Sequence, residues 1–376
     1  MRAIDRRHML ARLAALGGLA GWSGLARADG AIRIGQSLPL TGPLSSVVKP
    51  ITEGQRLLLQ DVNSRGGVAG RPVQIVTLDD GGDPQRAVDN VHRLVNVEGV
   101  ECLFGFASVA CLMRVLPLLT QYKMPLLGVY NGADIARTAK QPYLFTTTAS
   151  ISDEVAEMVR TLAALRLQRL AVAYQDNEFG RFMMPLVEGI AKQHGTTIVV
   201  SAPVSPDGTN AGAAAAAVAA KNPQALLLLA AGEAVVGFMR AARDTVQAPV
   251  YALSVAGTTA LIDQLGPAAR GLALTQVVPY PWKQTSALTR QFAAALDKSD
   301  LTPTYDRMWG FLNASILVEV LRRAAPAPNP ASIIAAIERM GSVDIGGYRL
   351  SFDGANHHGS HFVDITMVGP NGKYVR

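Results

Sequence analysis

Polar and small side chains follow three of the short apolar runs in this sequence, at the points where those runs end. Residues 105–108 read Gly-Phe-Ala-Ser, residues 129–132 read Val-Tyr-Asn-Gly, and residues 174–180 read Tyr-Gln-Asp-Asn-Glu-Phe-Gly. The first segment leads directly into a helical pattern, and the free amides at a helix N-terminus favour an anion. These segments indicate a site that binds a small polar or anionic molecule.

Signatures of catalysis are missing from the sequence. It contains no G-x-S-x-G elbow, no H-E-x-x-H motif, no C-x-x-C pair and no phosphate loop. The glycines of residues 66–70 precede an apolar run, so they predict a turn and not a dinucleotide fingerprint. Asp79 and Asp80 are interpreted as the end of a strand, and Asp83 as the cap of a helix that begins at Pro84. We expect neither enzymatic activity nor a cofactor.

His357, His358 and His361 are close enough in sequence to hold a transition metal. The preceding run 353–356, Asp-Gly-Ala-Asn, reads as a hairpin turn, so exposed loop histidines are the favoured interpretation and no metal site is expected. Cys102 and Cys111 are interpreted as small buried hydrophobes, with a disulfide between them as the open alternative.

Composition and charge narrow the class of protein. The 376 residues are 49% hydrophobic and 17% charged, which provides for a large core and for two or more domains. The formal net charge is +6, but residues 1–28 hold five of the 35 basic residues and one of the 29 acidic ones, so the remainder carries only +2. A nearly neutral body lacks the electrostatic footprint of a nucleic-acid-binding protein, and we expect no nucleic-acid partner.

Residues 1–28 read as a secretory signal. A basic start precedes an apolar stretch at 9–25, which ends in Ala26-Arg27-Ala28, a cleavage pattern. Paired arginines followed by apolar residues resemble a twin-arginine signal, and a general secretory route stays open. The alternative is an uncleaved anchor, for which the stretch is short and broken by glycines. Without a lipobox cysteine, we expect a soluble periplasmic product.

From residue 31 onward, short apolar runs alternate with amphipathic stretches. This alternation predicts βαβ units, right-handed crossovers and parallel sheets. One series ends near residue 150 and a second begins there, so the predicted fold class is α/β, with two doubly wound parallel-sheet lobes. Residues 348–352 and 362–368 alternate like antiparallel strands. Ligands of such sheets bind beyond the carboxyl ends of the strands, where the three polar segments lie.

The mature chain resembles the type I periplasmic binding proteins, specifically their leucine/isoleucine/valine-binding branch. The motifs that carry the resemblance are residues 34–43, 63–71, 79–84 with Ala87, and 174–180; Gly271 and residues 356–359 also match. Together they span nearly all of the mature chain.

The resemblance implies two lobes joined by a three-segment hinge that closes over a ligand. The crossing segments are expected near 148–152, 277–282 and 344–348. The N-terminal lobe would then comprise residues 29–150 and 282–344, and the C-terminal lobe residues 151–281 and 345–376.

The resemblance also implies a pocket. Its carboxylate-gripping hydroxyl falls on Val109, where backbone amides and the neighbouring Ser108 would serve instead, and the aromatic residue that covers the ligand falls on Phe179. The residues expected to bind ligand are Ser108, Val109, Ala110, Tyr130, Asn131, Gly132, Phe179 and Ser254.

Ser254 stands where the family carries the acid that neutralises an amino acid's ammonium group. An unpaired buried ammonium costs on the order of several kcal/mol. Either another acid serves, with Asp153, Glu178 and Glu233 as candidates, or the ligand lacks an α-amino group. A small carboxylic acid, aromatic ones included, is therefore as compatible with the sequence as an amino acid.

The function implied is that of the solute-binding subunit of an ABC importer, a monomer that delivers a small amino acid or related carboxylate to a permease in the inner membrane. The alternative is a periplasmic sensor that presents its closed form to a receptor or regulator. An enzyme on the same fold is disfavoured because the catalytic residue sets are missing.

Overall fold

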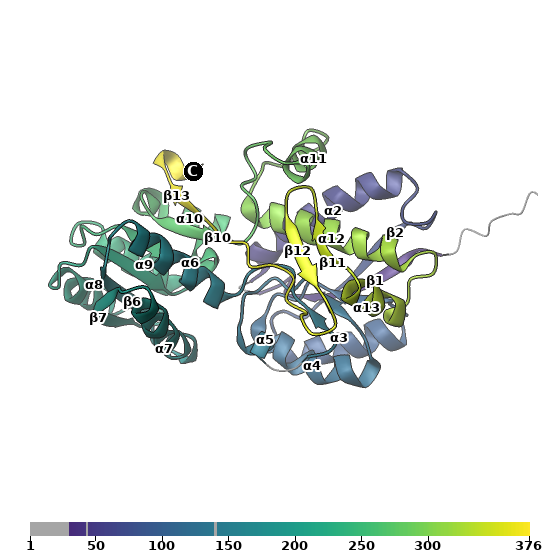
Figure 1. Cartoon of the computed structure of the whole chain (residues 1–376), viewed down its shortest axis with the longest axis horizontal. Coiled ribbons are helices and arrows are strands. Elements are labelled where there is room, and N and C mark those ends of the chain that lie inside the picture. The colour runs from purple at the N-terminus through teal and green to yellow at the C-terminus, as the bar shows by residue number, and fades with distance from the viewer. Residues whose placement is uncertain (1–29, 43, 139–140) are drawn as a thin grey trace, which may run out of the picture.

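The computed structural model describes residues 30–376 except residues 43 and 139–140. The predicted signal, residues 1–28, lies outside the described residues. The described chain forms two lobes placed end to end along the long axis of the molecule (Figure 1), and each lobe has its own β-sheet.

The N-terminal lobe contains a parallel sheet in the order β2-β1-β3-β4-β5. Side chains alternate between its faces, so Cys102 and Phe104 join one buried cluster with helices α2 and α12, while Leu103 joins another with α3 and α4. The strands are β1 (Ile32–Leu38), β2 (Val73–Asp79), β3 (Cys102–Phe104), β4 (Leu126–Leu127) and β5 (Leu144–Phe145). The helices are α2 (Ser45–Ser64), α3 (Pro84–Asn96), α4 (Val109–Tyr122), α5 (Ile135–Thr138), α11 (Ala287–Leu296), α12 (Tyr305–Ala324) and α13 (Pro330–Glu338).

The C-terminal lobe contains a mixed sheet in the order β14-β13-β10-β9-β8-β6-β7. Its interior strand β8 is an Ala-Leu-Leu-Leu-Leu run buried throughout, because helices cover both faces of the sheet. The strands are β6 (Arg169–Gln175), β7 (Thr197–Val204), β8 (Ala225–Leu229), β9 (Val250–Ala252), β10 (Ala273–Gln276), β13 (Asp364–Val368) and β14 (Tyr374–Val375). The helices are α6 (Ile151–Ala164), α7 (Glu178–Gln193), α8 (Ala211–Ala219), α9 (Glu233–Ala242), α10 (Thr259–Leu265) and the 3₁₀ turns η1 (Ser254–Gly257), η2 (Gly266–Ala269) and η3 (Pro370–Gly372).

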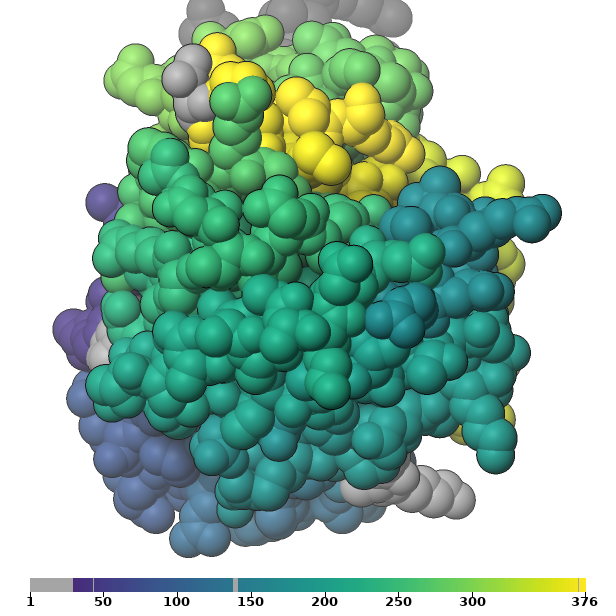
Figure 2. Space-filling model, turned by 90° about the vertical axis from the view of Figure 1, so that its left-hand side faces the viewer, coloured from purple at the N-terminus to yellow at the C-terminus, as the bar shows by residue number. Residues whose placement is uncertain are grey.

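The predicted fold class is confirmed: both lobes are α/β units built on parallel strands. The tail departs from the parallel pattern as expected, because β13 runs antiparallel to β10 and β14 antiparallel to β13. The other predicted tail strand, β12 (Arg349–Phe352), forms a separate hairpin with β11 (Gly341–Asp344). In a view facing the C-terminal lobe, the last residues lie along its upper edge (Figure 2).

The chain passes between the lobes at three places. Ala149 packs in the N-terminal core and Ile151 in the C-terminal core, and the chain returns at Val277, which packs with the N-terminal core again. The first crossing thus lies between Ala149 and Ile151, and the second between Gln276, which ends β10, and Val277. The hydroxyl of Tyr348 lies 3.0 Å from the carbonyl oxygen of Thr147 and 3.3 Å from that of Val277, so one buried side chain contacts both crossings.

The third crossing comes later in the chain than the sequence indicated. Tyr348, Leu350 and Phe352 are buried in the N-terminal core, because the hairpin lays its apolar face on that lobe. The chain then follows β5, with a bridge between Thr146 and His358, and reaches the C-terminal sheet only at Asp364. The expected boundary at 344 is therefore corrected to about residues 360–363, and residues 345–359 lie with the N-terminal lobe.

The two cysteines are free and buried, as the favoured interpretation had it. None of the helices in the described ranges has the length and apolar character needed to cross a membrane.

Helices α2 and α12 approach each other at two glycines, Gly54 and Gly310. A Cβ atom built on Gly54 would lie 1.9 Å from the carbonyl oxygen of Arg307, and one on Gly310 would lie 1.9 Å from that of Ile51. The side chain of Arg307 reaches back to α2, where its Nε donates to Glu53 at 2.9 Å. Close contact with α2 thus fixes the first turns of α12, which carry residues of the site described below.

We predict that Gly310→Ala destabilises the protein by about 1–3 kcal/mol, because the added methyl group overlaps backbone that cannot move aside cheaply. The measurement is chemical denaturation followed by circular dichroism. Gly189→Ala in α7 is the matched control: its Cβ would meet nothing within 4 Å, so it should stabilise by about 0.5–1 kcal/mol. Equal effects of the two variants would contradict the close approach.

Candidate ligand-binding site

A cavity of about 550 Å³ lies between the lobes. The N-terminal lobe contributes the first turns of α2, the segments that follow β3 and β4, and the first turns of α12. The C-terminal lobe contributes residues 231–232 and the region of η1 and α10, and residues 276–278 close it on the hinge side. The carboxyl ends of parallel strands thus meet at the cavity, as expected for open α/β sheets.

Apolar side chains make up most of the lining. Three lining residues, Gln276, Tyr305 and Trp309, each hold a buried polar side-chain atom without a hydrogen-bond partner within the described residues, and two of these atoms are N–H groups. The indole Nε1 of Trp309 and the amide Nε2 of Gln276 are buried, and neither has a hydrogen-bond partner within the described part of the chain. Both are donors, and Gln276 as a whole is only 4% exposed. Buried donors without partners are uncommon in folded proteins, and these two belong to residues that line the cavity.

The structure brings most of the sequence-predicted residues to this cavity. Ser108, Val109, Tyr130, Asn131 and Ser254 line it, whereas Ala110, Gly132 and Phe179 do not. The three residues that fall outside the lining have identifiable positions elsewhere.

Phe179 is half-buried and packs within its own lobe, beside the cluster formed by α6, α7 and the sheet. Gly132 is buried against the start of α6, where its carbonyl oxygen accepts from the amide of Ile151 at 2.9 Å. Ala110 is exposed on α4. Of these, Gly132 has a role at the first crossing, which is distinct from contact with a solute.

Several residues that line the cavity use their polar atoms within the protein. The hydroxyl of Ser108 caps α4 by accepting from the amide of Cys111 at 3.3 Å. The hydroxyl of Tyr130 accepts from Gln55 at 2.7 Å, so this ring turns its polar end into the N-terminal lobe. The groups of this wall that are still available to a solute are the side chain of Val109 and the backbone amides of the first turn of α4 that make no hydrogen bond.

Ser254 is bound to an acid that the sequence analysis did not select. Its amide and its hydroxyl donate to Glu154 at 2.8 and 3.0 Å, and Thr275 donates to the same carboxylate. Glu154 is 1% exposed, and burial raises its pKa against these hydrogen bonds. One signal pointed to it: Glu154 lies on the buried stripe of α6 with Val155 and Met158. It fixes η1 against β10, behind the cavity wall.

Asp306 is the only Asp, Glu, Lys, Arg or His residue among the described residues that line the cavity. It is 8% exposed, and burial raises its pKa to about 6. Its Oδ2 accepts from the hydroxyl and the amide of Thr259 at 3.2 and 3.3 Å, which joins α12 of one lobe to α10 of the other. In the sequence, Asp306 reads as an ordinary acid in the first turn of a helix, which is why it was missed.

The three acids proposed from the sequence lie elsewhere. Asp153 takes part in the capping box of α6, Glu178 is exposed in the first turn of α7, and Glu233 accepts from Gln264 at 2.7 Å on the exposed start of α9. None of the three is among the residues that line the cavity.

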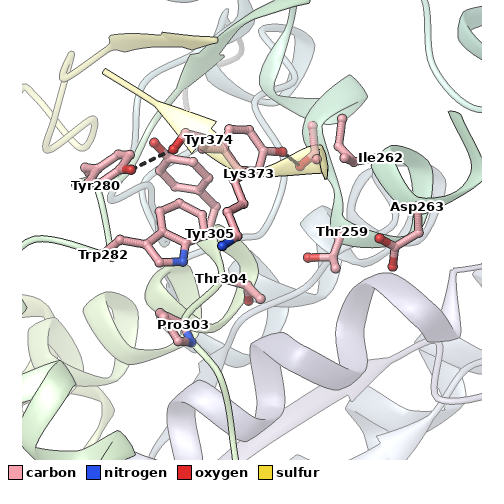
Figure 3. Close-up of a pocket in the computed structure, with 12 residues that line it drawn as sticks. Thr259, Ile262, Asp263, Tyr280, Trp282, Pro303, Thr304, Tyr305, Lys373 and Tyr374 are labelled. Atoms are coloured by element: carbon pink, nitrogen blue, oxygen red, sulfur yellow. Dashed lines mark hydrogen bonds between the residues drawn. The ribbon is translucent and has the colours of Figure 1, made fainter. Parts of the chain in front are cut away.

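A second cavity of about 390 Å³ adjoins the first and shares Gly257 and Tyr305 with it. The rings of Tyr280, Trp282, Tyr305 and Tyr374 gather on one side of it, and Thr259 and Asp263 lie on the other (Figure 3). Trp282 stacks on Tyr374 with ring centroids 5.3 Å apart, and Tyr305 meets Tyr374 edge to face at 5.1 Å. The rings pack on one another across the hinge side of the lobes.

The histidines do not converge on one point. The ring of His357 packs at a tilt against that of Phe145 with centroids 4.2 Å apart, His358 is hydrogen-bonded to Thr146 at 3.0 Å, and His361 pairs with a carboxylate of α6 at 2.9 Å. Only His361 is exposed, so the interpretation of all three as exposed loop residues is wrong for two of them. No group of three or more possible metal ligands occurs within residues 30–376 outside the gaps.

A family model described as "Periplasmic binding protein" matches residues 31–373, which is nearly the whole of the described chain. The chain belongs to the periplasmic binding protein family. Members of this family bind solutes and do not catalyse reactions, and the relatives that the chain matches include proteins named for the binding of leucine, isoleucine and valine. The interlobe cavity of this binding protein is accordingly its candidate solute site.

Leu/Ile/Val-binding protein homolog 7 of Brucella melitensis is 26% identical over 188 residues, 48% of this chain and 47% of that protein. The chain thus spans about half the length of the curated relatives it matches. An extracellular ligand-binding receptor from Verminephrobacter eiseniae is 25% identical with a TM-score of 0.82, over 92% of this chain and 100% of that one. A solute-binding protein from R. palustris in complex with benzoate is 19% identical with a TM-score of 0.76, over 92% and 95% of the chains, which shows likeness of fold alone.

We predict that Asp306 makes the unliganded binding protein less stable as the pH rises. Its folded pKa of about 6 exceeds the reference value of 3.8, so the folded state holds this proton more tightly than the unfolded chain. The resulting stability is fully present below the unfolded pKa and is lost as the pH rises through the folded pKa. The Asp306→Asn variant cannot ionise at this position. Its free energy of unfolding, relative to that of the wild type, should therefore rise by at most about 3 kcal/mol between pH 4 and pH 7.

Thermal or chemical unfolding at several pH values measures this difference, because the other titrating groups are common to both proteins. Asp263→Asn, on the facing helix α10, is the matched control and should follow the wild type. Parallel curves for wild type and Asp306→Asn would contradict the assignment.

Proposed function

We propose that this protein is the solute-binding subunit of an ABC importer. It is exported to the periplasm with removal of residues 1–28 and acts there as a monomer. It captures a small and largely apolar amino acid or related carboxylate and delivers it to a permease in the inner membrane. The observation that carries the proposal is the interlobe cavity, whose apolar lining contains unpartnered buried donors from the N-terminal lobe at Trp309 and from the end of β10 at Gln276.

The position of these donors supports capture by closure. A solute shifts a two-state hinge only if it binds the closed state better than the open one, which requires contacts made to both lobes at once. Trp309 lies on α12 of the N-terminal lobe, and Gln276 ends a strand of the C-terminal sheet. Acceptor atoms of one solute that meet both donors favour the closed arrangement.

The size and lining of the cavity support the class of solute. A volume of about 550 Å³ lies in the range of small-molecule sites and accommodates an amino acid or an aromatic acid with some water. Val47, Ile51, Val255 and Leu261 are among the side chains that would face an apolar group. The Brucella relative is named for leucine, isoleucine and valine, which is consistent with such a solute.

Mass spectrometry of the solute released by denaturing the purified protein tests the proposal first. We expect a molecule with a carboxylate and an apolar body, and uptake of that molecule should fall when the gene is deleted. Recovery of a sugar or a nucleotide would contradict the class of solute, and unchanged uptake would contradict the role in import.

We predict that Trp309→Ala weakens binding of the released solute at least tenfold, because it removes both an apolar wall and an unpartnered donor. Trp309→Phe keeps most of the wall and should lose less. Phe179→Ala is the control, since its ring packs outside the cavity lining, and its affinity should stay within about twofold of wild type. Isothermal titration calorimetry measures all three, and a larger loss at Phe179 than at Trp309 would contradict the site.

A further inference from the structure

We infer that Asp306 recognises the ammonium group of the solute, and that this acid is supplied by the N-terminal lobe. The inference rests on the proposed function and names a specificity-determining residue within it. Ser254 stands where the resemblance places an acid that pairs with the ammonium group. In this inference Asp306 on α12 provides that acid instead.

The surroundings of Asp306 leave its charge without a partner. Its neighbour Arg307 is committed to Glu53 and to the carbonyl oxygen of Thr302, at 2.9 and 2.8 Å. The hydrogen bonds found for Asp306 within the described residues come from Thr259 and end on Oδ2, so no hydrogen bond is found for Oδ1 of this cavity-lining residue. A buried carboxylate without a cation is costly, and a cationic group on the solute would compensate it.

The other polar atoms of the cavity define the rest of the solute. Trp309 and Gln276 present unpartnered donors, and the first turn of α4 presents free amides near Val109. Donors of this kind match a carboxylate, and Asp306 matches an amine. One acid and several donors in an apolar cavity therefore fit a zwitterion with an apolar side chain better than a simple carboxylic acid, which would bring a second negative charge.

The contact with Thr259 makes this recognition part of lobe closure. Thr259 begins α10 in the C-terminal lobe, and its hydroxyl and amide donate to Asp306 of the N-terminal lobe, so this contact joins the two lobes. A cation at Oδ1 keeps the carboxylate ionised, and an ionised carboxylate is the stronger acceptor for Thr259. The amine and the opposite lobe thus stabilise the same charged group.

The pH dependence follows from the groups around Asp306. On its own helix these are Tyr305 and Arg307, on α2 Glu53, on α10 Asp263, and on β14 Tyr374, with Lys373 beside it. Burial raises the pKa of Asp306 to about 6, and this effect outweighs the lowering of the pKa by Arg307. The unliganded carboxyl group is therefore largely protonated at pH 5 and ionised at pH 7.5. An amine-bearing solute should bind more weakly at pH 5, whereas a simple acid should bind as well or better there.

The test compares solutes that differ only by the α-amino group: L-leucine with 4-methylpentanoate, and L-phenylalanine with 3-phenylpropanoate. Calorimetry at pH 7.5 and pH 5 should show that the wild type binds at least one amino acid about 30-fold more tightly than its deaminated partner at pH 7.5. This preference should shrink at pH 5 and disappear in Asp306→Asn. Asp263→Asn, an exposed acid outside the cavity lining, should keep it.

The pH series on the wild type keeps the test valid should Asp306→Asn fold poorly. A deaminated acid that binds as tightly as its amino acid, a preference that survives in Asp306→Asn, or no binding of either amino acid overturns the inference. In the last case, binding of the deaminated acids leaves the proposed function standing, whereas binding of none of the four probes contradicts both.

Discussion

The separation of the two cores is the constraint on which the rest of the structure depends. Each sheet is covered on both faces by its own helices, so each lobe buries its apolar surface without help from the other. The lobes are joined by three crossings, two of which meet the hydroxyl of Tyr348. Because neither core needs the other, the surfaces that face each other are free to leave a cavity and to move about the hinge.

Electrostatics within the cavity follow from the same separation. Burial in an apolar lining disfavours the ionised form of a single acid, and the raised pKa of Asp306 reflects this. In an open form, water would hydrate Asp306. In the described structure Thr259 donates to one oxygen of Asp306, and in our proposal a solute cation meets the other. Glu154, in contrast, does not line the cavity, because hydrogen bonds from Ser254 and Thr275 hold it inside the C-terminal lobe.

The periodicity of the sequence was sufficient to predict the α/β class and the two series of parallel strands, because buried parallel strands leave long apolar runs between amphipathic helices. It did not show that the β11–β12 hairpin lies on the N-terminal lobe. That placement depends on contacts such as Phe352 with Phe145, whose ring centroids are 6.3 Å apart and which are remote in sequence. Local pattern contains no information about which of two sheets a hairpin will cover.

For the site, segments that end strands were the useful signal, and Ser108, Tyr130 and Asn131 were found through it. Trp309 and Asp306 were missed because they lie on a helix that returns to the N-terminal lobe late in the chain, so only the α2–α12 packing brings them to the cavity. Phe179 follows a strand as expected, yet its ring packs beside α6.

The central claim is that one solute bridges the two lobes inside the interlobe cavity. A crystal structure of the protein with the solute that it retains on purification tests this most directly. The account predicts electron density within hydrogen-bonding distance of groups from both lobes, among them Asp306 and Gln276. Density in the neighbouring cavity beside Trp282 and Tyr374, or against one lobe alone, would contradict it.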